Sequence, residues 1–139
     1  MIQKFYNLKI NTNGQKLYEF TKETSLWISQ NNFSEGMLNL SIMHTSASII
    51  IQENADPDVQ KDLIKYFDKL VPMDNKLYIH TTEGEDDMPA HIKSALTNNQ
   101  ITLSIKDQKP LLGTWQGLYL FEHRIEKQTR SIVHHFVGN

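Results

Sequence analysis

Hydrophobic positions along the chain divide it into many short strands and a few helical stretches. Alternation of apolar and polar residues, together with β-branched runs, is typical of strands. This pattern predicts strands over residues 5–11, 16–20, 37–44, 49–51, 76–80, 101–105, 110–112, 118–124 and 131–137. The pair Asn13-Gly14 favours the positive φ angles of a tight turn, so we expect the first two strands to form a β-hairpin.

Three other segments carry helical signals. A hydroxyl cap at Thr21 and the apolar cluster 26–28 predict a short helix that ends near the asparagines at 31 and 32. The strongest start signal is a cap, a first-turn proline and an acid in succession at residues 56–58, followed by apolar residues at helical spacing up to Pro72. Pro89 opens a third helix that runs to Leu96, with Asp86 or Asp87 as its cap.

The order of these elements predicts the fold class. Strands outnumber helices, and no regular strand-helix alternation is visible. We therefore expect an α+β protein that is mainly β: an antiparallel β-sandwich, jelly-roll-like, with two to three flanking helices. The 139 residues fit a single domain over 1–139.

Composition limits the classes of binding partner and the cellular compartments that we expect for this protein. The formal net charge of -2 argues against an extended nucleic-acid-binding face. No apolar run is long enough for a membrane span, and no signal peptide is visible, so we predict a cytoplasmic protein without a membrane partner. Because the chain has no cysteine, thiol chemistry, disulfides and Cys-type zinc sites are excluded.

Imidazoles and carboxylates must then carry any metal or acid/base chemistry. His80 and His91 flank an acidic loop, residues 83–87, and His44 lies at the end of a predicted strand. Three such histidines can hold a divalent metal and leave one position open for water. The spacing matches no short metal motif. Taken singly, such histidines are more often hydrogen-bonded residues than ligands, and an acidic loop is usually a solvated turn that caps the next helix.

Other polar groups allow both a binding and a structural interpretation. Glu53 and Asn54 precede the strongest helix start, where an anion or an ordinary cap can sit. Trp115 and Gln116 stand between two glycines, as in a ligand-contacting turn or a core bend. The chain has no GxSxG elbow, P-loop or GxGxxG motif, so the corresponding hydrolase, nucleotidase and dinucleotide classes have no support.

Three long stretches, in order, resemble the YjbQ-like family, also labelled secondary thiamine-phosphate synthases: HTSASIIIQENADPDVQKDL at 44–63, HTTEGEDDMPAHIKSAL at 80–96 and LLGTWQGLYLFEHR at 111–124. The resemblance implies a one-domain β-sandwich and a homotrimer, with a histidine and carboxylate site near a subunit contact. It favours His44, His80 and His91 as metal ligands. Glu53, Asp87 and Glu122 become acid/base candidates, while the role of His123 stays open.

The implied activity joins a pyrimidine-methyl pyrophosphate to a thiazole phosphate and releases pyrophosphate. Zinc is the favoured metal and magnesium an alternative, with a small, phosphorylated molecule as substrate. Residues expected to contact substrate or anion are Asn54, Trp115, Gln116 and Arg124. Two other functions stay open: a metal-dependent hydrolase or phosphatase, since a metal beside carboxylates suits hydrolysis, and a non-catalytic protein that binds a metal or anion.

Overall fold

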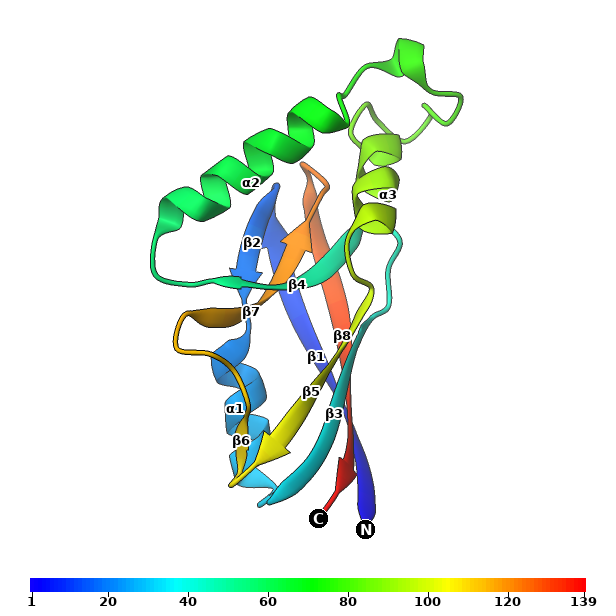
Figure 1. Ribbon diagram of the computed structural model, residues 1–139. Coiled ribbons are helices and arrows are strands. Elements are labelled where there is room, and N and C mark those ends of the chain that lie inside the picture. The colour runs from blue at the N-terminus through cyan, green and yellow to red at the C-terminus, as the bar shows by residue number, and fades with distance from the viewer.

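The computed structural model describes residues 1–139 and contains two curled antiparallel sheets with three α-helices (Figure 1). The larger sheet has the strand order β1-β8-β3-β5-β6, and the smaller sheet has the order β2-β7-β4. The strands are β1 Ile2–Asn13, β2 Lys16–Glu19, β3 Glu35–Ile42, β4 Ala47–Glu53, β5 Gln100–Lys106, β6 Lys109–Pro110, β7 Gln116–Glu122 and β8 Lys127–Gly138.

The predicted hairpin between β1 and β2 is wrong, although the chain does turn where it was expected. β1 pairs with β8 along its whole length, from Ile2 opposite Gly138 to Asn13 opposite Lys127, whereas β2 pairs with β7. Gly14 has a φ of +91°, a conformation that favours glycine. The turn therefore carries the chain from one sheet to the other, because the long β8 strand offers β1 a more extensive partner.

The main core lies between the two sheets. Alternate residues of β3, Leu38, Leu40 and Ile42, are buried there, as expected for a strand with one face toward the core. β7 differs, because Leu118 to Glu122 are all buried. A second apolar cluster, in which Leu63, Ile64 and Phe67 pack over Leu17, Tyr119 and Phe121, covers the other face of β7.

The helices are α1 Thr21–Gln30, α2 Pro57–Leu70 and α3 Asp87–Leu96. The start of α2 is confirmed: the Asp56 side chain accepts a hydrogen bond from the Asp58 backbone N–H at 2.9 Å. The predicted hydroxyl cap of α1 is wrong, because Phe20 holds the cap position and Thr21 Oγ1 accepts the Leu118 N–H instead. The asparagine-rich end of α1 is confirmed by a φ of +55° at Asn32.

The segment between α2 and α3 is irregular, so the predicted strand over residues 76–80 is wrong. A short 3₁₀ turn, η1 Asn75–Leu77, begins at Asp74, whose side chain accepts the Lys76 N–H at 3.0 Å. In Figure 1 this segment projects beyond the sheets, next to the start of α3. His80 consequently lies in an irregular stretch and not at a strand end. The predicted strand at 110–112 is also shorter, since β6 ends at Pro110.

The class is confirmed as mixed α+β and mainly β, with three α-helices. The curled sheets form a half-barrel, so the jelly-roll-like sandwich is not confirmed. β1 and β2 are edge strands of different sheets, which leaves this side of the barrel open. No helix combines the length and the apolar composition needed to cross a membrane.

Candidate functional site

Three side chains from two adjacent segments form a compact cluster. Asp87 lies in the first turn of α3, and His91 lies one turn later on the same face of the helix. His80 comes from the irregular segment that precedes α3. One potential ligand atom from each of the three residues lies within 4.8 Å of the others. The Ser94 hydroxyl, in the C-terminal half of α3, donates to the Ala47 carbonyl at 3.0 Å and docks the helix on β4.

The carboxylate of Asp87 is the centre of the cluster. Its Oδ2 atom lies 2.6 Å from His80 Nε2 and 3.2 Å from His91 Nε2. The Asp87 side chain is almost completely buried, whereas both histidines are partly exposed. The arrangement places one buried oxygen between two imidazole nitrogens that ligands can reach from outside.

Arg124 holds the other side of this carboxylate. Its Nη1 donates to Asp87 Oδ1 at 2.6 Å, and its Nε donates to Asp86 Oδ2 at 2.9 Å. Burial raises the pKa of Asp87, but the hydrogen bond from His80 and the positive charge of Arg124 outweigh it and hold that pKa below its ordinary value. Asp87 is therefore an ionised, pre-positioned acceptor.

Hydrogen bonds between the acidic loop, residues 83–87, and Arg124 hold Asp87 in position. Arg124 also donates to the Glu83 backbone carbonyl, and Asp86 accepts the Ile125 N–H, so the loop closes around the guanidinium. Gly84 has a φ of +113°, and a Cβ there would lie 2.8 Å from Asp86 Oδ1. Asp86 was predicted as a possible helix cap. It holds the position before α3, but its side chain makes no cap hydrogen bond and binds Arg124 instead.

The orientation of His91 is fixed by a backbone carbonyl. His91 Nδ1 lies 2.9 Å from the carbonyl oxygen of Thr45, and a carbonyl only accepts hydrogen bonds. Nδ1 must therefore carry the proton. In the neutral ring, Nε2 then presents its lone pair to Asp87 Oδ2.

His44 is not brought into this cluster. Its Nε2 accepts the Ser131 backbone N–H at 2.9 Å, so that lone pair is already engaged. Its ring lines the same surface depression as His91, about 250 Å³ in volume. To serve as a ligand through Nδ1, a neutral His44 would have to give up the bond to Ser131, because one ring nitrogen must keep a proton. The geometry thus favours Asp87 as the third ligand candidate.

Glu122 is also not part of the three-residue cluster. Its carboxylate is fully buried and accepts from the Thr12 hydroxyl, two nitrogens of Arg130, and the backbone N–H groups of His123 and Arg124. Five donors already occupy the acceptor positions of this carboxylate. Its role as a base stays a prediction, and Asp87 is the better placed carboxylate.

The remaining candidates lie at the opposite end of the small sheet. Glu53 pairs in register with Gln116, whereas Ala47, near α3, pairs with Glu122. A seven-residue strand separates these ends by about 20 Å. The group at the far end comprises Glu53, Asn54, Trp115 and Gln116, joined by the hydrogen bond from the Asn54 N–H to the Trp115 carbonyl at 3.0 Å. Within one chain, these residues do not share a site with the histidines.

A buried polar group behind the site was not predicted from sequence. His123 Nε2 lies 2.9 Å from Ser48 Oγ, and the buried His123 Nδ1 has no hydrogen-bond partner. Burial, with smaller contributions from the charges of Lys93 and Arg130, lowers the pKa of His123 to about 3. The ring is therefore neutral, and it lies outside the three-residue cluster. The local sequence gave no signal for its contact with Ser48, 75 positions away.

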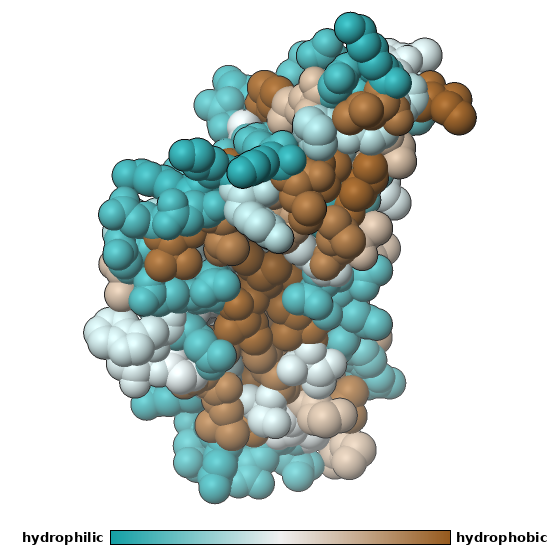
Figure 2. Space-filling view, turned by 45° about the horizontal axis from the view of Figure 1, so that its top comes forward, coloured by the Kyte–Doolittle hydropathy of each residue, from teal (hydrophilic) through white to brown (hydrophobic).

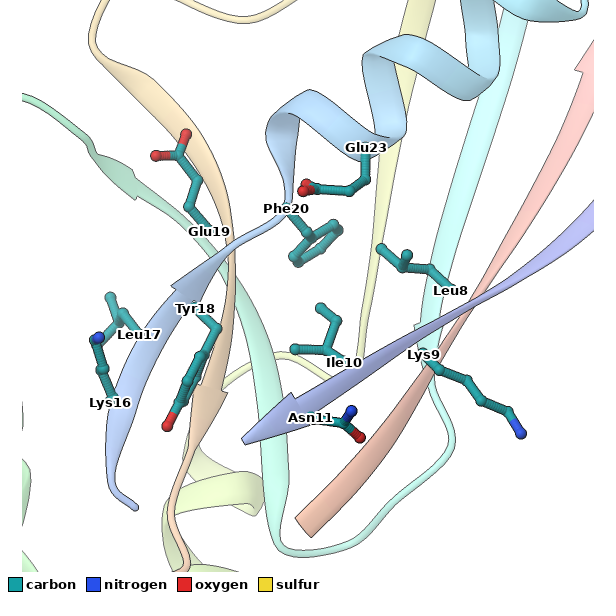
Figure 3. Close-up of a pocket in the computed structure, with 10 residues that line it drawn as sticks. All are labelled: Leu8, Lys9, Ile10, Asn11, Lys16, Leu17, Tyr18, Glu19, Phe20 and Glu23. Atoms are coloured by element: carbon teal, nitrogen blue, oxygen red, sulfur yellow. The ribbon is translucent and has the colours of Figure 1, made fainter. Parts of the chain in front are cut away.

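A separate groove of about 420 Å³ runs between β1 and β2 (Figure 3). Tyr18, Ile10 and Phe20 point into the space between the strands, while Glu19 points away. None of the predicted site residues lines this groove.

The fold and the sequence both match known proteins. Crystal structures with the same fold include a YjbQ/UPF0047 family protein of Clostridium acetobutylicum, with a TM-score of 0.83 and 31% identity over 96% of this chain and 99% of that chain. A protein of unknown function from Sulfolobus solfataricus has a TM-score of 0.85 and covers 99% of this chain and 100% of that chain; at 16% identity it shows the fold alone.

Relatives in sequence extend across bacteria and archaea. A UPF0047 protein of Synechocystis is 45% identical and covers 94% of this chain and 89% of its own length. A UPF0047 protein of Methanocaldococcus jannaschii is 40% identical and covers 88% of this chain and 86% of its own length.

These matches overturn the predicted thiamine-phosphate synthase activity, because the relatives are described only as UPF0047 proteins or as proteins of unknown function. The site agrees with this correction. Arg124, the nearest cation, is already engaged by Asp86 and Asp87 and is not free for a pyrophosphate leaving group. The family model for "UPF0047 protein YjbQ-like" matches residues 6–139. The chain therefore belongs to the YjbQ-like UPF0047 family, a family of unknown function.

Proposed function

We propose that this protein binds one divalent cation through His80, His91 and Asp87 and uses it as a Lewis acid toward a small ligand. The observation that carries the proposal is the contact between His91 Nε2 and Asp87 Oδ2 at 3.2 Å. With the His91 proton held on Nδ1 by Thr45, a lone pair and a carboxylate oxygen face each other. Two acceptors at this distance repel unless a cation or an additional proton lies between them.

The surroundings of these groups suit a metal site. Histidine ligands in metal sites commonly donate their second ring N–H to a carbonyl or carboxylate, as His91 does to Thr45. Arg124 similarly holds Asp87 Oδ1 and leaves Oδ2 directed at the histidines. Two ligands at about 2.0–2.1 Å from a tetrahedral ion lie roughly 3.3 Å apart, close to the His91–Asp87 separation of 3.2 Å. The His80–Asp87 contact of 2.6 Å is a hydrogen bond, and His80 Nε2 would give up its proton to bind the ion.

The donor set favours zinc over magnesium. Two imidazoles and one carboxylate form a common set of protein ligands in catalytic zinc sites. Magnesium prefers oxygen ligands and retains several waters. Three protein ligands leave room for a ligand molecule at zinc, and the depression beside His91 offers access from solvent. A bound zinc ion would supply Lewis-acid chemistry.

The proposal is tested by metal analysis of gently purified protein. We expect about one zinc per chain in the wild type and a loss of zinc in His91→Ala and Asp87→Asn. The control His135→Ala alters a histidine that stacks on Phe5, away from the cluster, and should retain the metal. Absence of zinc in the wild type, even after zinc is added, would remove the proposal.

We also propose a homotrimer, which the family resemblance implies. Exposed apolar side chains support burial in an assembly: Ile79 is 102% exposed, and Tyr66, Leu70 and Leu77 are each more than half exposed. Figure 2 shows a band of hydrophobic residues along one face of the molecule. Light scattering should give a mass three times the 16.2 kDa of one chain. A monomer mass at micromolar concentration would contradict the assembly.

A further inference from the structure

His44 is the second histidine that lines the surface depression, and a backbone hydrogen bond determines which of its ring nitrogens carries the proton. His44 Nε2 accepts the Ser131 backbone N–H at 2.9 Å, so Nε2 must carry a lone pair. When the ring is neutral, the proton therefore resides on Nδ1. Nδ1 points away from Ser131 and makes no hydrogen bond within the chain. The result is a polar N–H donor without a protein partner.

Partial burial and the nearby positive charge of Arg130 favour the neutral form of the His44 ring. Partial burial lowers the pKa of His44, and the positive charge of Arg130 lowers it further. Glu122 acts in the opposite direction, but it is neutralised in part by its own ion pair with Arg130, and the net pKa is below the ordinary value. His44 is thus a neutral donor, as distinct from a cation or a metal ligand.

The depression that His44 and His91 line is suited to a ligand that accepts hydrogen bonds. Its lining consists of His44, Thr45, His91, Ser94, Ala95 and Asn99. It contains no acidic side chain, and the Asn99 amide and Thr45 hydroxyl make no side-chain hydrogen bond in the chain. At about 250 Å³ it is below the usual size of a drug-sized pocket, so the ligand must be small.

We propose that this depression binds a small oxyanion, with the His44 Nδ1–H donating to one anion oxygen while another oxygen faces the His80, Asp87 and His91 cluster. The inference rests on the proposed cation site, because a cation there would supply the charge complementary to the anion. Phosphate and carboxylate groups share the required chemistry. His44 is in this role a ligand-binding residue.

The first test concerns the tautomer and needs no metal. Nitrogen-15 NMR of the wild-type protein at pH 7 distinguishes the two neutral forms of histidine and the imidazolium. We expect His44 to be the Nδ1–H form, with Nε2 unprotonated. Observation of the Nε2–H form, or of the imidazolium, would overturn the inference whether or not the protein binds zinc.

The second test measures anion binding by calorimetry of zinc-loaded protein with inorganic phosphate, and with acetate as the carboxylate probe. Loss of one hydrogen bond to a charged group should weaken binding by about 10- to 100-fold in His44→Phe. Zinc content should stay at the wild-type level. His44→Gln, which keeps a polar side chain, serves as a second variant if His44→Phe folds poorly, and His135→Gln is the matched control.

The outcomes separate the two proposals. Unchanged anion affinity in zinc-loaded His44→Phe overturns the role of His44 and leaves the cation site intact. Loss of zinc from that variant makes His44 a metal ligand and also overturns the inference. If wild-type protein binds neither phosphate nor acetate while holding zinc, the oxyanion class is wrong. A wild type without zinc refutes the proposed function, and the tautomer measurement still decides the state of His44.

Discussion

Replacement of Glu122 by glutamine should destabilise the protein severely without affecting the cation site. The carboxylate has 0% exposure and accepts five hydrogen bonds, two of them from the guanidinium of Arg130. Glutamine has nearly the same shape, but its NH₂ group would face donors, and Arg130 would be left buried without its counter-charge. Removal of one partner of a buried pair costs about 3–5 kcal/mol.

The assay is urea unfolding, with thermal unfolding as a second measure. A loss of about 3–5 kcal/mol corresponds to a midpoint lower by roughly 10–20 °C for a domain of this size. Glu126→Gln is the control, since Glu126 is exposed and makes no ion pair. If the Glu122→Gln protein were within about 1 kcal/mol of wild type in its free energy of unfolding, the buried Arg130–Glu122 pair would not be a major source of stability. A stable variant that cannot bind zinc would instead restore Glu122 as a site residue.

Three further changes test the surroundings of the site. Arg124→Met removes the donor to Asp87 Oδ1, so zinc affinity measured by competition with a chelator should fall by about 10- to 100-fold. Gly84→Ala introduces a Cβ at a φ of +113° and should lower the free energy of unfolding by about 1–3 kcal/mol in urea. Burial lowers the pKa of His134 from 6.5 to about 4. Between pH 6.5 and pH 4, His134 is therefore protonated in the unfolded protein but neutral in the folded protein. Stability should therefore fall by about 3 kcal/mol as pH drops from 6.5 to 4, and His134→Gln should flatten that part of the profile.

Features set by local sequence were predictable. The start of α2 depends on neighbours within two positions, Asp56 and Asp58, and it was placed correctly. Asp87 and His91 are four residues apart on a predicted helix, so their proximity follows from helical geometry.

Features set by distant partners were not predictable. The turn at Gly14 gives no indication that β1 will pair with β8, more than a hundred residues later. Likewise, the state of His44 depends on the backbone N–H of Ser131, 87 positions away. The absence of cysteine and the family resemblance drew attention to the histidines, but only the hydrogen bonds to their rings distinguish a candidate ligand from a donor.

The most direct test of the cation site is anomalous diffraction from crystals grown with zinc, recorded on both sides of the zinc absorption edge. We expect one strong peak per chain, bounded by His80 Nε2, His91 Nε2 and Asp87 Oδ2. Well-ordered density for the three side chains, with no anomalous peak between them, would contradict it.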